Sequence, residues 1–315
     1  MACAFHRWSQ DRRPVSVHRH AVIGPDNALA ASRFVLDGAV VFLWGVSGFL
    51  LTSSSRELRL WLEERWSGAL RLALALAVIA TAFQLPLQTA IIGAGWGDLS
   101  NVSLAWSVMT QTTSGLAWAG KAGILSMALL ALMVIPAHRL VVLALASMAM
   151  LASLAFSGHA AMHGGWLGGI HRANQWLHLL SGGFWIGALF PVVSTLRALH
   201  AETLCQAARA ALIRFSRMGH LAVALVVVTG ALNTGLILGT PSLDWSHPYQ
   251  GLLAIKIGLV LSMVSIALFN RYWLVPKLSG QGGTTRALEW MTRLEVMLAA
   301  LVLGLVVTLS ALDPY

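Results

Sequence analysis

Eight long apolar stretches recur along this chain, and they constrain its fold more than any other feature. A segment of about 20 apolar residues is long enough to cross the hydrocarbon core of a bilayer. Within lipid, an open chain satisfies all of its backbone hydrogen bonds only as a helix. The sequence therefore predicts an all-α polytopic membrane protein with eight transmembrane helices. These are expected over residues 29–52, 68–92, 115–135, 140–157, 174–196, 213–239, 252–274 and 292–312.

The composition agrees with this class of protein. Hydrophobic residues make up 57% of the chain and charged residues only 10%, with a mean hydropathy of +0.73, which a soluble surface does not accommodate. Residues 100–114 are less apolar, and we expect a short surface helix or loop there. A basic leader, residues 1–28, precedes the membrane domain, residues 29–315. We expect this leader either to be a disordered tail or to lie upstream of the natural start.

The positive charges predict the orientation of the helices. Arginines and lysines cluster on the first, third, fifth and seventh connections, whereas the second, fourth and sixth carry almost none beyond Arg172. Because positively charged connections stay in the cytoplasm, both termini and the fourth connection are expected outside it, facing the periplasm or the cell exterior. The net charge of +9 is thus a signal of topology. It indicates a lipid bilayer as the partner and no nucleic acid, and the chain has no nucleotide-binding loop.

The two halves of the chain share residue offsets that suggest an internal repeat. Polar residues and a tryptophan recur at the same spacing, and a Lys-x-Gly sequence recurs later in each half. The corresponding residues are Arg33, Asp37, Trp44 and Lys121 in one half and Asn174, His178, Trp185 and Lys256 in the other. We expect a parallel 4+4 repeat with halves at 29–157 and 171–315, joined by a His/Gly-rich loop at 158–170. The alternative is chance similarity among apolar helices.

The fourth connection and the helix after it hold the strongest candidates for metal ligands. Imidazole and thioether groups are neutral ligands that bind copper. His159 and His163 are four residues apart, one helical turn if the fourth helix continues this far. Met162 reaches the same site if the Gly164-Gly165 sequence turns the chain, and His171 and His178 lie two turns apart on one stripe. The alternative is that these are interfacial histidines at helix ends.

Polar residues inside the predicted spans are candidates for a transport path. Ionisable groups in a membrane usually face a bundle interior or a wet cavity. We therefore place Asp37, Lys121, Asn233 and Lys256 on this path, with Asp37 paired to Lys121 or Lys256. The alternative for both lysines is that they reach outward to the lipid headgroups.

Tryptophans near the histidines are expected to shield the site. Trp166, Trp176 and Trp185 suit an aromatic belt at the outer interface. A second function also stays open at this point, because a buried membrane histidine is a common axial ligand of haem b. In that alternative the protein is a membrane oxidoreductase in which His178 is paired with His159 or His163.

Several motifs of this chain resemble the copper resistance protein D (CopD/PcoD) family. They are Ser157-Gly-His-Ala160, Leu177-His-Leu-Leu, Phe184-Trp-Ile-Gly-Ala188, the segment from Pro248 to Lys256, Asn270-Arg271, Pro276, Arg293-Leu-Glu295 and Asp313-Pro314. The resemblance implies an inner-membrane protein of copper homeostasis that is not an enzyme. It would move Cu(I) or Cu(II) inward with a separate periplasmic copper-binding protein of the CopC type. It also implies copper contacts at His159, His163 and His178, with Met162 and His171 in support.

Overall fold

The computed structural model describes residues 24–52, 54–156, 162–239, 248–277, 282–310 and 312. In this part of the chain the regular elements are helices, and eight of them are long and apolar enough to cross a membrane. The all-α, eight-span architecture expected from the sequence is confirmed. The α-helices are α1 (Pro25–Thr52), α2 (Arg56–Ile92), α3 (Val102–Gln111), α4 (Thr113–Val134), α5 (Arg139–Leu154), α6 (Gly165–Ala198), α7 (Cys205–Leu238), α8 (Pro248–Phe269) and α9 (Gly282–Leu309).

The short helix α3 is the one that does not span. Together with a 3-10 turn over Trp96–Ser100 it fills the less apolar segment between α2 and α4, as expected. The side chain of Asn101 caps α3 by accepting the backbone N–H of Leu104 at 3.1 Å. Residues 100–114 thus leave the bundle as a small helical hairpin with α4.

Several spanning helices are longer than their apolar stretches. α2, α7 and α9 begin at Arg56, Cys205 and Gly282, well before residues 68, 213 and 292 where the apolar stretches begin. A helix keeps its backbone hydrogen bonds after it leaves the bilayer, where its polar side chains face water. Hydropathy detects only the part embedded in lipid, so the expected starts were too late.

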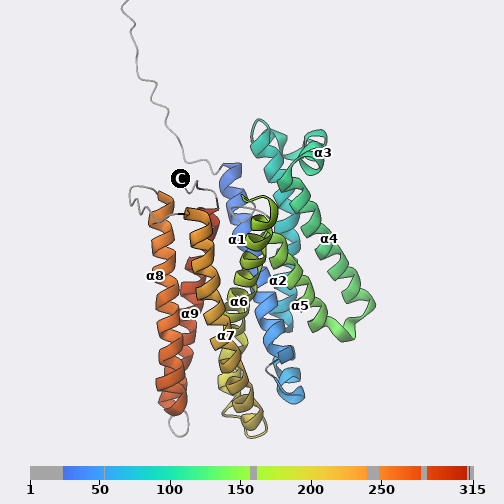
Figure 1. Ribbon diagram of the computed structural model, residues 1–315. Coiled ribbons are helices and arrows are strands. Elements are labelled where there is room, and N and C mark those ends of the chain that lie inside the picture. The colour runs from blue at the N-terminus through green and yellow to red at the C-terminus, as the bar shows by residue number, and fades with distance from the viewer. Residues whose placement is uncertain are drawn as a thin grey trace, which may run out of the picture.

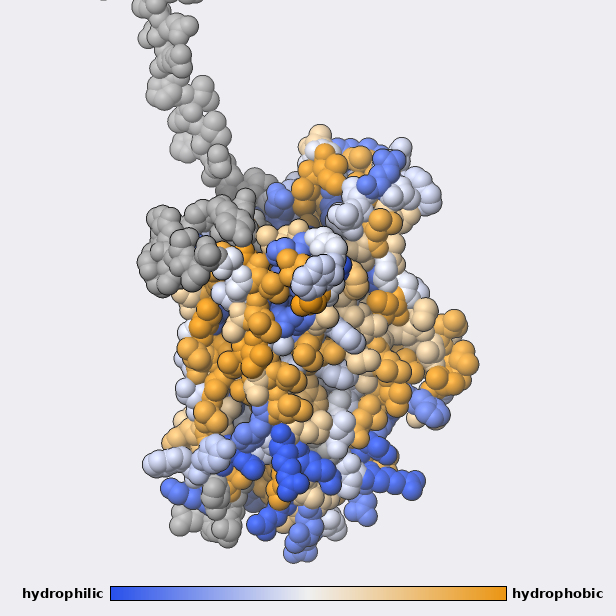
Figure 2. All heavy atoms as spheres, in the orientation of Figure 1, coloured by the Kyte–Doolittle hydropathy of each residue, from blue (hydrophilic) through white to orange (hydrophobic). Residues whose placement is uncertain are grey.

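The connections alternate between two ends of the bundle. The last turns of α1, α4, α6 and α8 lie at one end, and the start of α1, helix α3 and the last turn of α9 lie at the other (Figure 1). Figure 2 shows an apolar band between these ends and a concentration of hydrophilic residues at the first of them. We call the first end the basic end, since it holds Arg65, Arg197 and Arg293, and the other the outer end.

Helices α1 and α6 cross at the centre of the bundle. At the crossing, a Cβ atom on Gly45 would collide with the backbone of Gly187, so the absence of side chains permits the close approach. The Phe42 ring meets the Phe190 ring edge to face at 5.0 Å between centroids. Trp44 donates its indole N–H to the carbonyl of Leu180 at 2.9 Å, so the two central helices are fixed by both packing and a hydrogen bond.

The remaining helices pack around this pair in corresponding ways. In the first half α2 and α5 contact α1, and α4 contacts α5; in the second half α7 and α9 contact α6, and α8 contacts α9. Replacing α1, α2, α4 and α5 by α6, α7, α8 and α9 reproduces these contacts, but the contact between α2 and α4 has no counterpart of similar extent between α7 and α8. The parallel 4+4 repeat stays a prediction from the sequence.

Candidate metal centre

His163 lies immediately before α6, and His171 lies two turns inside it. The turn into the helix uses Gly165, whose φ of +59° is a left-handed conformation that favours glycine. Helix α5 ends at Leu154, so His163 is not on a continuation of that helix. The condition under which His159 and His163 would share one helical face, a fourth helix that continues as far as His163, is therefore not met, and His159 itself lies outside the described residues.

The structure brings His163 and His171 together. Their Nδ1 atoms are 3.1 Å apart and their ring centroids 5.2 Å apart. The His171 side chain is fully buried, with 0% exposure, and His163 is half-buried. Gly168 permits this approach, because a Cβ atom there would collide with the carbonyl of His163.

This separation of the two nitrogens suits either a hydrogen bond or a shared metal ion. In the hydrogen bond, one ring carries a proton on Nδ1 and the other accepts it. For metal–imidazole bonds of about 2.0 Å, a 3.1 Å separation corresponds to an N–metal–N angle of roughly 100°. A metal would need both lone pairs, so its binding requires that the shared proton leave and that both rings be protonated on Nε2.

The other residues near the His163–His171 pair do not complete a metal site. Met162 adjoins His163 and is 45% exposed. Arg172 lies on the same turn of α6, with its guanidinium 6.0 Å from the centre of the Phe156 ring. Among the described residues, no group of three or more His, Cys, Asp or Glu side chains is gathered closely enough to hold a metal. The structure thus provides two imidazoles at this place.

His178 belongs to a separate polar network between α6 and α7. Its Nδ1 lies 2.9 Å from the hydroxyl of Thr229. Asn174 donates to the Thr229 carbonyl at 2.9 Å and to Oδ1 of Asn233 at 2.8 Å, and Asn233 donates to Oε1 of Gln175 at 2.7 Å. Because each of these groups lies within spanning helices, the network satisfies polar atoms that lipid would leave without partners.

Each half of the bundle has a lysine whose charge reaches the corresponding polar residue; Lys121 is buried and Lys256 is half-buried. The charge of Lys121 in α4 acts on Asp37 in α1, together with that of Arg33. The charge of Lys256 in α8 acts on His178 in α6. Lys121 thus acts on a carboxyl group in one half and Lys256 on an imidazole in the other.

Two sets of buried polar residues were missed at the level of sequence. Thr81, Gln84 and Gln88 lie on one face of α2, and within the described chain a polar side-chain atom of each has no hydrogen-bond partner. Near the other end of the bundle, Asn270 donates to buried Glu295 at 3.2 Å. Polar residues at helical spacing within an apolar stretch, as in Gln84-Leu-Pro-Leu-Gln88, were the available signal.

The tryptophans divide between the surface and the core. Trp166 and Trp176 are exposed, which fits the expected outer belt. Trp185 is only 4% exposed and packs with Phe184 and Met263 in an apolar cluster between α6, α7, α8 and α9. Its placement in an exposed belt was therefore wrong, because the neighbouring helices bury the Trp185 ring.

Taken together, eight apolar helices around buried polar side chains, among them His171 and Lys121, define a multi-pass membrane protein with a polar interior. Residues 24–169 match the family described as copper resistance protein D-like, N-terminal domain, and residues 209–309 match the family described as copper resistance protein D. The chain belongs to the copper resistance protein D family.

Individual relatives support this membership over nearly the whole chain. The chain is similar to the inner membrane protein YebZ of Escherichia coli, with 30% identity over 286 residues that cover 90% of this chain and 98% of the relative. It is similar to copper resistance protein D of Pseudomonas syringae pv. tomato, with 30% identity covering 90% and 96%. The copper transport protein CutJ of Bacillus subtilis is 28% identical over 71% of this chain, which is 42% of that longer protein.

The fold also resembles a solved structure of a different protein. The bd oxidase from Geobacillus thermodenitrificans superposes with a TM-score of 0.51 and covers 92% of this chain and 87% of its own, at 13% sequence identity. At this identity the likeness concerns the fold alone.

Proposed function

We propose that this protein handles copper in a bacterial inner membrane, as part of copper homeostasis, and takes the ion up at its outer end. The copper-related names of two relatives support the class of cargo. We locate the copper site at the contact between His163 and His171, whose Nδ1 atoms are 3.1 Å apart. The ion is cargo, so this function is a transfer of copper and involves no covalent chemistry on a substrate.

The ligands at this pair favour an exchangeable site. Two imidazoles at an angle of roughly 100° leave further coordination positions open, and Met162 and His159 are the candidates that the sequence offers for them. Soft thioether favours Cu(I), and the histidines also accept Cu(II). An incompletely coordinated ion can be delivered by another protein, and a separate periplasmic donor of the CopC type is the partner that we propose.

From the pair, the path that we propose leads inward along α6. His178 is seven residues beyond His171, about 10 Å further along the helix axis. There the ion would meet the His178–Thr229 contact and the Asn174–Asn233 network. The charge on Lys256 opposes a cation at His178, so this second position favours passage over retention. Asp37 and Lys121 supply the corresponding pair in the other half.

The binding step is tested by removing both rings. We expect the His163→Ala/His171→Ala double variant of the full-length protein to lose one equivalent of tightly bound copper, measured by elemental analysis after dialysis in each oxidation state. His220→Ala is the matched control, because His220 is exposed and bonds to Ser216 and Tyr272 instead. Unchanged stoichiometry in the double variant would contradict the proposal. A Soret band in the visible spectrum would instead favour the haem alternative.

A further inference from the structure

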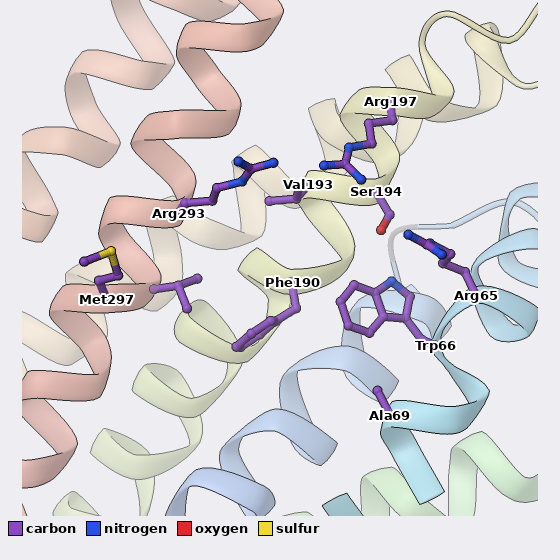
Figure 3. Close-up of a pocket in the computed structure, with 10 residues that line it drawn as sticks. Arg65, Trp66, Ala69, Phe190, Val193, Ser194, Arg197, Arg293 and Met297 are labelled. Carbon is purple, nitrogen blue, oxygen red and sulfur yellow. The ribbon is translucent and has the colours of Figure 1, made fainter. Parts of the chain in front are cut away.

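A cavity of about 450 Å³ lies at the basic end between α2, α6 and α9. Three arginines border it, one from each helix: Arg65, Arg197 and Arg293 (Figure 3). Figure 3 shows Arg197 and Arg293 pointing toward each other across Val193, while Arg65 points toward Ser194. The cavity is distant in the fold from the histidines at the outer end, and the proposed function does not use it.

The charges around this cavity are unbalanced. Glu289 is shared by Arg197 and Arg293, with contacts of 3.4 Å and 3.2 Å. Arg65 is exposed and makes no ion pair within the described part of the chain. Three guanidinium groups with one carboxylate leave an excess of two positive charges. Guanidinium groups in such a cluster are well suited to bind a phosphate, because each presents a planar fork of N–H donors.

The arginines and the apolar residues line opposite ends of the cavity. On every one of the three helices, the arginine is nearer to the basic end and the apolar residues are nearer to the middle of the bundle. Trp66 and Ala69 follow Arg65, Phe190 and Val193 precede Arg197, and Val296 and Met297 follow Arg293. A ligand that fits this cavity therefore has an anionic head at the basic end and an apolar body directed into the bilayer.

We propose that this cavity binds an anionic glycerophospholipid from the leaflet at the basic end. Basic pockets between transmembrane helices on the cytoplasmic side are suited to anionic headgroups. A free phosphate or a nucleotide has no acyl chain to pack against the apolar walls formed by Trp66, Phe190 and Met297. The lipid would join α9 to α2 and α6, since each helix contributes one arginine and part of the apolar wall.

Native mass spectrometry of the full-length protein in a neutral detergent tests this proposal. We expect phosphatidylglycerol to bind and to raise the melting temperature, and phosphatidylcholine with the same acyl chains to do neither. Arg65→Gln should weaken phosphatidylglycerol binding about fivefold, the factor that corresponds to about 1 kcal/mol for one arginine near a membrane surface. Arg65→Lys should restore part of the loss. Arg65 is the preferred position because the variant breaks no ion pair in the described chain.

The controls separate a lipid from other occupants. Arg209→Gln and Arg217→Gln remove exposed arginines from α7 that do not line the cavity, and they should leave lipid binding unchanged. Inorganic phosphate and glycerol 3-phosphate should compete poorly, because neither fills the apolar walls. Equal binding of the two lipids, an unaffected Arg65→Gln variant, or full competition by inorganic phosphate would each overturn the proposal. All of these outcomes are independent of copper binding.

Discussion

At the scale of residues, the contact between His163 and His171 depends on glycine. Gly165 turns the chain into α6 and Gly168 leaves room for the His163 carbonyl. The histidine-rich run was recognisable from the sequence, and so was the chain reversal at Gly164-Gly165. The pairing of residues eight apart was not, because His163 lies outside the helix and helical spacing does not describe its position.

A methyl group at Gly168 should separate the two imidazoles. We expect Gly168→Ala to weaken copper binding at least tenfold, since the new Cβ collides with the His163 carbonyl, and to cost about 1–3 kcal/mol of stability as overpacking. Copper titration and thermal unfolding in detergent measure the two effects.

Gly169→Ala is the matched control for this variant. The neighbouring glycine has open space around its Cβ position and lies in the same helix. It should bind copper normally and gain up to about 1 kcal/mol from higher helix propensity. If Gly168→Ala bound copper as well as Gly169→Ala, the close approach of the His163 carbonyl would be irrelevant to the site.

At the scale of elements, α6 and α7 are joined by amides within the bilayer. Asn233 accepts from Asn174 and donates to Gln175, while Thr229 meets His178. The presence of Asn233 in an apolar stretch was a usable signal of a buried polar site. Its partners depend on the rotation of α6 against α7, which hydropathy alone does not define. The same limitation hid the polar face of α2 at Thr81, Gln84 and Gln88.

Breaking this network should loosen the helix pair. We expect Asn233→Leu to destabilise the protein by about 1 kcal/mol, the typical magnitude for hydrogen bonds between membrane helices, because it removes a partner from both Asn174 and Gln175. Thermal unfolding in detergent measures the loss. Thr234→Val is the control, since within the described chain the Thr234 hydroxyl bonds to the Gly230 carbonyl of its own helix. Equal melting temperatures for the two variants would show that the network does not hold α6 to α7.

At the scale of the whole molecule, the bundle encloses a polar interior. We propose that Asp37 with Lys121 and His178 with Lys256 occupy corresponding positions of two halves, in which most helix contacts recur and the α2–α4 contact does not. The number of spans, their alternation and the clustering of positive charge at one end were all predictable, since hydropathy and charge act over whole segments. The true helix lengths and the burial of Trp185 required the packed structure.

Copper uptake into vesicles that contain the purified full-length protein tests the central claim most directly. Copper is supplied on the side of the outer end, in each oxidation state, and the ion accumulated inside is measured over time. We expect the wild-type protein and His220→Ala to accumulate copper above protein-free vesicles, and His163→Ala/His171→Ala to fall to the protein-free rate. Uptake by the double variant at the wild-type rate would contradict the role of the two imidazoles at the outer end.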